Sequence, residues 1–88
     1  MTRREVTIVN ALGLHARAAA RFVHVASRFA SQIRVTRGSR TMDGKSILGL
    51  LLLSAGRGTV IEIAAEGADE QDAVDALAAL AARGFEDA

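Results

Sequence analysis

The chain has 88 residues, of which half are hydrophobic, and this length allows one compact domain over residues 1–88 but not two. It contains no cysteine, which excludes disulfides, thiolate nucleophiles and cysteine-ligated metal. The formal net charge of +1 is too small to indicate a polyanionic partner, although ten of the eleven basic residues are arginine, the side chain best suited to bidentate phosphate contacts.

The first third of the chain predicts a strand, a turn and a long helix. Apolar and polar residues alternate over Glu5–Val9, which is typical of a half-buried strand, and Asn10–Gly13 then supplies a turn. Apolar residues recur at helical spacing over Ala16–Phe29, which predicts a helix with one packed face. The opposite face of that helix carries a basic stripe of Arg17, Arg21, His24 and Arg28.

A hairpin and a short helix are expected next. Alternation over Ile33–Thr36 and Arg40–Met42 predicts two short strands joined by a tight turn at Gly38. Ser46 is a favourable N-cap for a helix over Ile47–Leu53. The middle of the chain therefore predicts a hairpin followed by a short helix.

The last third predicts a strand and a closing helix. Alternation over Thr59–Glu66 indicates a fourth strand. Asp69 is expected to cap a last helix that ends at Gly84. The complete order predicts an α+β fold in which helices cover one face of a mainly antiparallel sheet. The order of the strands within that sheet does not follow from the sequence.

His15 lies between the predicted first strand and first helix, and so occupies the N-cap or first turn of that helix. The first N–H groups of a helix lack internal partners and carry the positive end of its dipole, which favours a bound anion such as phosphate. The same field disfavours imidazolium and leaves a neutral ring nitrogen able to attack phosphorus. Arg17 adds donors for phosphoryl oxygens. An exposed loop histidine beside a solvated arginine fits the same pattern, so local geometry alone leaves both interpretations open.

Two segments resemble a known family. Residues 10–19, Asn-Ala-Leu-Gly-Leu-His-Ala-Arg-Ala-Ala, resemble the active-site segment of the HPr family, the histidine phosphocarriers of bacterial phosphoenolpyruvate phosphotransferase systems. Residues 43–50, Asp-Gly-Lys-Ser-Ile-Leu-Gly-Leu, resemble the segment of these proteins that contains the regulatory serine. The order of elements also matches over nearly the whole chain. Two separated motifs in register are far more specific than either alone.

The resemblance implies a fold, a reaction and partners. The fold is the HPr-like open-faced β-sandwich of order βαββαβα, with a four-stranded antiparallel sheet covered on one face by three helices. His15 is expected to accept a phosphoryl group through Nδ1 from enzyme I, with Arg17 assisting, and to pass it to an EIIA-type acceptor. The protein is then a carrier and not an enzyme, because the sequence has no nucleotide-binding loop, metal carboxylates or second catalytic base.

One position departs from the commonest family pattern. Ala18 stands where the sugar-transport carriers usually have proline after the arginine. The run Ala18–Ala20 is similar to the nitrogen-related branch, whose carriers act mainly in regulation. Either residue suits a first helical turn, so the expected mechanism is the same. The sequence leaves the choice of branch open.

The short helix is apolar nearly all round, and a domain of this size cannot bury every face of it. Leu48, Leu51 and Leu52 are therefore predicted to remain exposed and to form a patch for a partner, although burial of all of them in the core is the alternative. Proteins of the HPr family dock partners through their first two helices. The docking residues expected on that basis are Ala20, His24, Ile47, Leu48, Leu51 and Leu52.

Ser46 is sufficiently explained as an N-cap, and regulation is a separate hypothesis. The resemblance implies phosphorylation by an HPr kinase/phosphorylase. A near-dianionic group at Ser46 would place negative charge beside the docking patch and weaken partners that expect a neutral or basic surface. A second function class follows, in which the chain is a regulatory binding module with Ser46 as the switch and His15 vestigial.

A nucleic-acid-binding domain is the remaining alternative. The near-neutral charge weighs against it, and so does the lack of aromatic residues for base stacking, because Phe22 and Phe29 are predicted to be buried. Its basic surface would consist of Arg17, Arg21, Arg28, Arg34 and Arg37.

Metal, cofactor and membrane functions are not expected. His24 follows His15 by nine residues, which is not a same-face helical spacing for two metal ligands, and no carboxylate accompanies them on that helix. The uninterrupted leucine run Leu50–Leu53 is far shorter than the roughly 20 residues of a membrane span. Met1–Glu5 fits neither a signal peptide nor a targeting helix. The protein is expected to be a cytoplasmic monomer.

Overall fold

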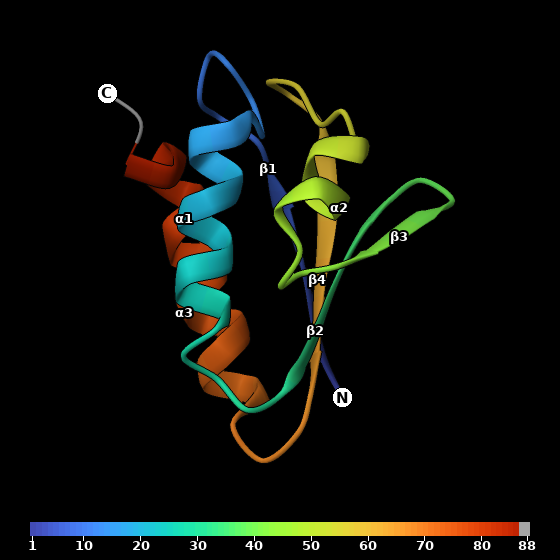
Figure 1. The fold of residues 1–88 in the computed structure, drawn as a ribbon, viewed down its shortest axis with the longest axis vertical. Coiled ribbons are helices and arrows are strands. Elements are labelled where there is room, and N and C mark those ends of the chain that lie inside the picture. Colours follow the sequence, from blue (N-terminus) through green and yellow to red (C-terminus); the bar gives the residue numbers. More distant parts are fainter. Residues whose placement is uncertain (87–88) are drawn as a thin grey trace.

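The computed structural model describes residues 1–86, which fold into a four-stranded antiparallel sheet with three helices (Figure 1). The elements follow the predicted order, and a short 3-10 turn closes the described chain. Their bounds are Thr2–Thr7 for β1, Ala16–Ala26 for α1, Gln32–Arg37 for β2, Arg40–Asp43 for β3, Ile47–Leu52 for α2, Val60–Glu66 for β4, Glu70–Ala82 for α3 and Gly84–Glu86 for η1.

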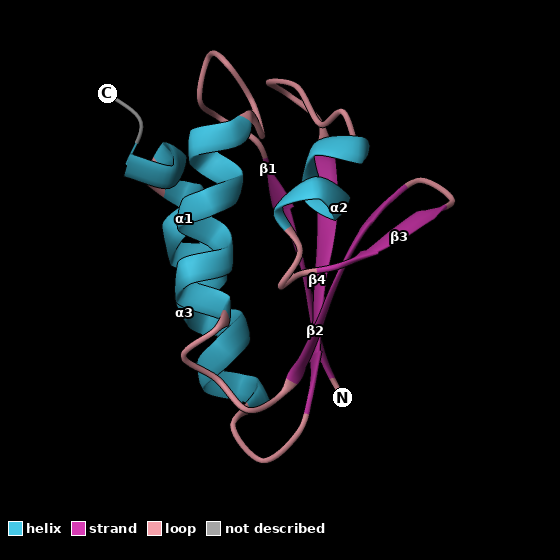
Figure 2. Cartoon of the chain, viewed as in Figure 1, coloured by secondary structure: helices cyan, strands magenta, loops and turns pink. Residues whose placement is uncertain are grey.

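The strands lie in the order β1, β4, β2, β3, and each neighbouring pair is antiparallel. The register places Ile61 of β4 opposite Val6 of β1, and Ile63 opposite Val35 of β2. Ile61, Ile63 and Val35 are buried, whereas the residues between them along each strand are exposed or half-buried. This alternation gives the sheet one buried face. On that face α3 packs on β1 and β4, and α1 lies between α3 and α2 (Figure 2).

The core lies between the sheet and the helices. Its fully buried side chains include Phe22 of α1, Leu50 of α2 and Leu77 of α3. Three alanines of α1 are buried on the same helix as Phe22, and their small size lets α1 pack closely against its neighbours. The predicted burial of Phe22 is confirmed, but Phe29 is only partly buried, and Phe85 of η1 is fully buried instead.

The ends of β1 and α1 differ from the prediction. β1 covers Thr2–Thr7 and not Glu5–Val9, because its ladder with β4 begins at Thr2. α1 ends at Ala26 and not at Phe29. The backbone N–H of Phe29 donates to the carbonyl of Ala26, three residues back, at 3.2 Å. A last turn tightened in this way is a common end of an α-helix.

Asp69 lies at the N-cap position of α3, as predicted, but its carboxylate does not cap that helix. It accepts hydrogen bonds from the backbone N–H groups of Ala30 and Ser31, at 2.9 and 3.0 Å, and from the Ser31 hydroxyl. The hydrogen bond from the Ser31 hydroxyl, followed by that from the Ala30 amide, lowers the pKa of Asp69 below its ordinary value. Asp69 therefore ties the start of α3 to the loop between α1 and β2.

Two arginines of the β2–β3 hairpin hold the end of α2. Arg37 donates to the carbonyl oxygens of Leu53 and Ser54, at 3.0 and 3.1 Å, and Arg40 donates to that of Leu52 at 2.9 Å. The last carbonyls of a helix lack internal partners and carry the negative end of its dipole. The hairpin arginines satisfy these groups and fix the short helix α2 in place.

Candidate functional site

His15 is the N-cap residue of α1. Its backbone is extended, with φ of −78° and ψ of −179°, and its ring is only partly covered. The backbone N–H of Arg17 donates a long hydrogen bond of 3.4 Å to Nδ1 of His15. A nitrogen that accepts a hydrogen bond carries no proton, so this arrangement leaves the ring proton on Nε2. The lone pair of Nδ1 is therefore directed at the first turn of α1.

The loop before His15 is held against the segment that follows α2. The side-chain amide of Asn10 donates to the carbonyl of Gly13 at 2.7 Å, and the N–H of Leu14 donates to the carbonyl of Ala55 at 2.9 Å. Gly13 has a φ of +67°, and a Cβ atom there would lie 2.5 Å from the carbonyl oxygen of Ala55. Glycine is needed at this position for both reasons. These contacts place His15 at a defined point between α1 and the end of α2.

The start of α1 is electrostatically suited to an anion. Its first turn contains no acidic residue, so no side chain there neutralises the positive end of the helix dipole. Arg17 is exposed in the same turn. The Nδ1 nitrogen of His15 and the first backbone N–H groups therefore meet at the start of α1, and Arg17 belongs to the same turn.

An apolar surface covers α2. Leu48 is 67% exposed and Leu52 51%, whereas Leu50 is fully buried. The predicted exposure of Leu48, Leu51 and Leu52 is confirmed. We call this surface the α2 patch; it consists of Ile47, Leu48, Leu51 and Leu52.

Leu12, in the loop before His15, is 66% exposed and was missed by the sequence analysis. A large apolar side chain within the predicted turn over Asn10–Gly13 was the available signal. On α1, Ala20 and His24 are also exposed. Both follow Arg17 at helical spacing, so these three side chains lie along one side of α1.

Two basic residues, Arg21 and Lys45, donate hydrogen bonds to backbone carbonyl groups. Arg21 donates to the carbonyl oxygens of Phe85 and Glu86, at 2.9 and 2.8 Å, and anchors η1 against α1. Lys45 donates to the carbonyl of Phe29 at 2.7 Å. The partners of Arg21 lie more than 60 residues away in sequence, so no local pattern indicates them.

Ser46 caps α2. The backbone N–H of Gly49 donates to its hydroxyl oxygen at 3.0 Å, which confirms the predicted N-cap. A Cβ atom on Gly49 would approach that hydroxyl to 3.2 Å, so the cap is closely packed. The hydroxyl is half-buried beside the exposed start of the α2 patch.

Comparison with known proteins identifies the family of this chain. The family model described as PTS HPr component phosphorylation site matches residues 2–83. The chain belongs to the HPr family. Its members are phosphocarriers of the phosphotransferase system and not classical enzymes, and the chain shares this phosphocarrier role.

Similar proteins agree with this assignment. The chain is 47% identical over 85 residues to phosphocarrier protein HPr of Cupriavidus necator, covering 97% of this chain and 96% of the relative. It is 42% identical over 85 residues to phosphocarrier protein NPr of Shewanella violacea, covering 97% and 93%. The fold matches the crystal structure of HPr from Thermoanaerobacter tengcongensis with a TM-score of 0.95 at 41% identity, covering 100% of this chain and 99% of that one.

The structure separates the arginines of the nucleic-acid alternative. Arg17 and Arg28 belong to the helical layer, whereas Arg34 lies between the buried Ile33 and Val35 and so projects from the opposite face of the sheet. Arg37 is bound to the end of α2. These side chains do not form one basic surface.

Residues 1–86 offer neither a metal-binding cluster nor a membrane-spanning helix. No group of three or more histidine, aspartate or glutamate side chains in that part of the chain is placed to hold a metal ion. None of the described helices combines the length and the apolar character that crossing a bilayer requires.

Proposed function

We propose that His15 carries the phosphoryl group, that enzyme I supplies it and that an EIIA-type protein receives it. The orientation of Nδ1 supports this proposal: it faces the N-terminus of α1, where the first turn contains no acidic residue and Arg17 is exposed. Nδ1 attacks phosphorus with its lone pair, the bond from phosphorus to the donor breaks, and Nε2 keeps its proton throughout. No general base is needed, because the attacking nitrogen is already unprotonated.

Arg17 contributes twice in this mechanism. Before transfer, its backbone N–H donates a hydrogen bond to Nδ1. Once Nδ1 is bonded to phosphorus, the same N–H donates to a phosphoryl oxygen. Its guanidinium group binds the remaining oxygens as charge develops on them. Because the site lies on the surface, water re-enters it when a partner leaves. The contacts with Arg17 then hold the phosphoryl group weakly enough for onward transfer.

Docking is assigned to the α2 patch together with Ala20 and His24 of α1 and Leu12. Exposed leucines near an active group serve as an interaction core, and the basic residues around them give orientation. Leu48, at 67% exposed, is the most exposed leucine of the patch, so Leu48→Ser is expected to weaken partner binding about tenfold with little change in the free energy of unfolding. Isothermal titration with enzyme I tests this, and equal affinity of the variant and the wild type would remove Leu48 from the interface.

The decisive experiment is incubation with enzyme I and phosphoenolpyruvate, followed by intact-mass analysis at alkaline pH, where phosphohistidine survives. Wild type is expected to acquire one phosphate that mild acid removes. His15→Ala is expected to acquire none, and His24→Ala, the matched histidine control, still acquires one at completion. If enzyme I that phosphorylates another HPr protein leaves the wild type unmodified, the regulatory-module interpretation is favoured over the carrier function.

Ser46 is proposed as a regulatory phosphorylation site for an HPr kinase. Its hydroxyl lies at the start of α2, directly before Ile47 and Leu48, so a phosphate there adds negative charge to the rim of the α2 patch. Incubation with the kinase, followed by mass spectrometry of wild type and Ser46→Ala, tests this. An unmodified Ser46 in the wild type would contradict it.

The protein is also proposed to act as a monomer in the cytoplasm. Each transfer needs the α2 patch to be accessible to one partner at a time, which a monomer provides. Sedimentation analysis at micromolar concentration is expected to give the monomer mass, and a stable dimer that covers the α2 patch would contradict this proposal.

A further inference from the structure

The 3-10 turn η1 packs against the start of the loop that leads to His15, although the two segments are far apart in the chain. A Cβ atom on Gly84 would lie 3.3 Å from Cβ of Asn10 and 4.0 Å from Cγ2 of Val9. The first of these distances is tighter than most contacts that Cβ atoms make, and Gly84 also has a φ of +63°. Glycine therefore allows η1 to approach Asn10 closely.

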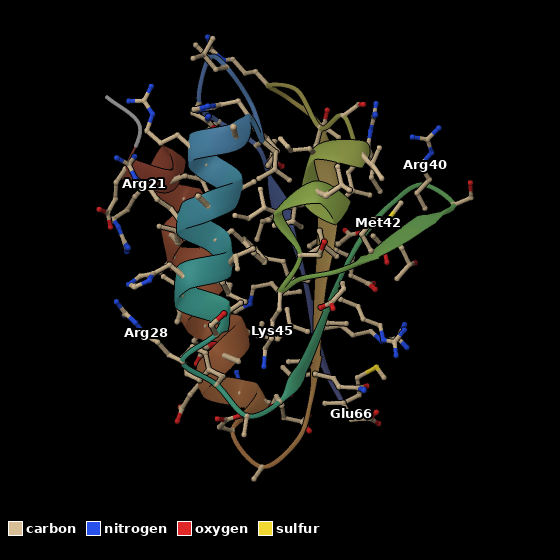
Figure 3. All side chains as sticks on the ribbon, viewed as in Figure 1. Arg21, Arg28, Arg40, Met42, Lys45 and Glu66 are labelled. Carbon is tan, nitrogen blue, oxygen red and sulfur yellow. The ribbon has the colours of Figure 1, made fainter. Side chains whose placement is uncertain are left out.

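The conformation of η1 depends on α1. Phe85 and Glu86 both have a φ of +58°, in the left-handed region that is unfavourable for residues other than glycine. Phe85 is fully buried, and Nη1 of Arg21 donates to the carbonyl oxygens of Phe85 and Glu86, at 2.9 and 2.8 Å. Figure 3 shows Arg21 projecting from α1 on the side where η1 lies. Arg21 and the burial of Phe85 therefore hold η1 in a conformation that its own sequence does not favour.

Asn10 connects η1 to the turn before His15. Asn10 is buried, and Nδ2 of its side chain donates to the carbonyl of Gly13 at 2.7 Å. The backbone N–H of Gly13 donates to the carbonyl of Asn10 at 3.1 Å, which closes a turn over these four residues. Loss of the contact with η1 would let the Asn10 side chain move, and the turn that precedes His15 would move with it.

The orientation of the His15 ring is sensitive to small movements of this turn. The hydrogen bond from the Arg17 N–H to Nδ1 of His15 is already long, at 3.4 Å. A displacement of about 0.2 Å takes such a contact beyond the range of a hydrogen bond. Through this bond the first turn of α1 favours the tautomer with its proton on Nε2, which is the form that leaves Nδ1 able to attack phosphorus.

We propose that Arg21 and Asn10 are positioning residues for phosphoryl transfer to His15. Arg21 holds η1, and η1 supports Asn10. Asn10 in turn fixes the loop that directs Nδ1 of His15 at the first turn of α1. Neither residue belongs to the group that binds the phosphoryl oxygens. This inference rests on the proposed function of His15 as the phosphoryl carrier.

The first test measures the ring tautomer of His15 in the protein alone, well below the unfolding temperature of each variant. Long-range proton–nitrogen NMR above the titration range of histidine is expected to show the Nε2–H form in the wild type. Arg21→Gln and Asn10→Ala are each expected to raise the population of the Nδ1–H form and to shift the Arg17 amide signal. Glu70→Gln removes contacts at the start of α3 and not at this loop, so it controls for a general loss of stability and is expected to leave both signals unchanged.

The second test measures the rate of transfer from enzyme I. Arg21→Gln and Asn10→Ala are each expected to lower kcat about tenfold, as a small misplacement of reacting groups implies. The KM for the carrier is expected to stay the same, because the α2 patch is intact in both variants. The double variant is expected to be no slower than Asn10→Ala, because Arg21 acts through Asn10. Glu70→Gln is expected to react at the rate of the wild type.

The proposal is overturned if Arg21→Gln leaves the tautomer or the rate of transfer unchanged, or if Glu70→Gln changes them as much as Arg21→Gln does. It is also overturned if the effects of the two single variants multiply in the double variant, because the two residues would then act independently. The tautomer measurement needs no donor. A wild type that enzyme I leaves unmodified therefore contradicts the proposed function, whereas an unchanged tautomer contradicts the positioning.

Discussion

The N-termini of α1 and α3 carry the same backbone dipole, but they are occupied in opposite ways. The first turn of α1 has His15 as its cap and no acidic residue. The first turn of α3 has Glu70 and Asp72, with Asp69 directly before them. At α3 the chain supplies negative charge from its own first turn, whereas the first turn of α1 supplies none, which suits the phosphoryl group that we propose for His15.

The acidic residues of α3 serve folding. Glu70 accepts a hydrogen bond from the Thr2 hydroxyl at 2.7 Å and pairs with the amino group of Met1 at 3.0 Å. These two contacts, the hydroxyl first, lower the pKa of Glu70 from 4.5 to about 2. Asp69 binds the loop at Ala30 and Ser31 in the same region. The start of α3 thus fastens the chain through its carboxylates, and the first turn of α1 contains no carboxylate.

Of the three substitutions that test this contrast, Arg17→Gln is expected to have the largest effect. Glutamine keeps a good helix former in an exposed position, so the free energy of unfolding changes little. Loss of the guanidinium is expected to lower the rate of phosphoryl transfer about 100-fold, as for other preorganised charge-stabilising donors. Rapid-quench kinetics with enzyme I measure it, with Arg57→Gln as the control. A rate within twofold of the wild type would remove Arg17 from the reaction.

Ala16→Glu makes the start of α1 resemble that of α3. Ala16 is exposed in the first turn, and a carboxylate there stabilises the helix by about 0.3–1 kcal/mol while competing with an incoming phosphate. Phosphoryl transfer is expected to slow about tenfold, because like charges repel in a partly screened site. Ala16→Gln is the neutral control. Faster transfer in Ala16→Glu than in Ala16→Gln would show that the lack of acidic residues in the first turn of α1 plays no part in phosphoryl transfer.

Glu70→Gln tests the α3 half of the comparison and has the smallest effect. The folded pKa of Glu70 is below its ordinary value, so its carboxylate stabilises the fold above pH 4.5, and this contribution is lost as the pH falls towards 2. The variant is expected to unfold at a lower temperature than the wild type near neutral pH, and the difference should disappear across that window. A difference that persists at the acid end would assign the effect to packing.

The local parts of the site could be predicted, and the long-range parts could not. His15 and Arg17 are two residues apart at the start of a helix, and Ser46 precedes an apolar run, so sequence patterns and the family resemblance suffice for both. The partners of Asp69 and Arg21 lie 38 or more residues away, and only the folded chain brings them together. The strand order could not be predicted for the same reason, because it depends on pairing between segments far apart in the chain.

The central claim is that His15, at the acid-free first turn of α1, receives the phosphate on Nδ1. Long-range proton–nitrogen NMR of the phosphorylated protein tests it most directly, because it assigns the modified ring nitrogen and the amide of Arg17 together. The account predicts phosphate on Nδ1, a protonated Nε2 and a large shift of the Arg17 amide as it turns to a phosphoryl oxygen. Phosphate on Nε2, or an Arg17 amide signal that does not move, would contradict it.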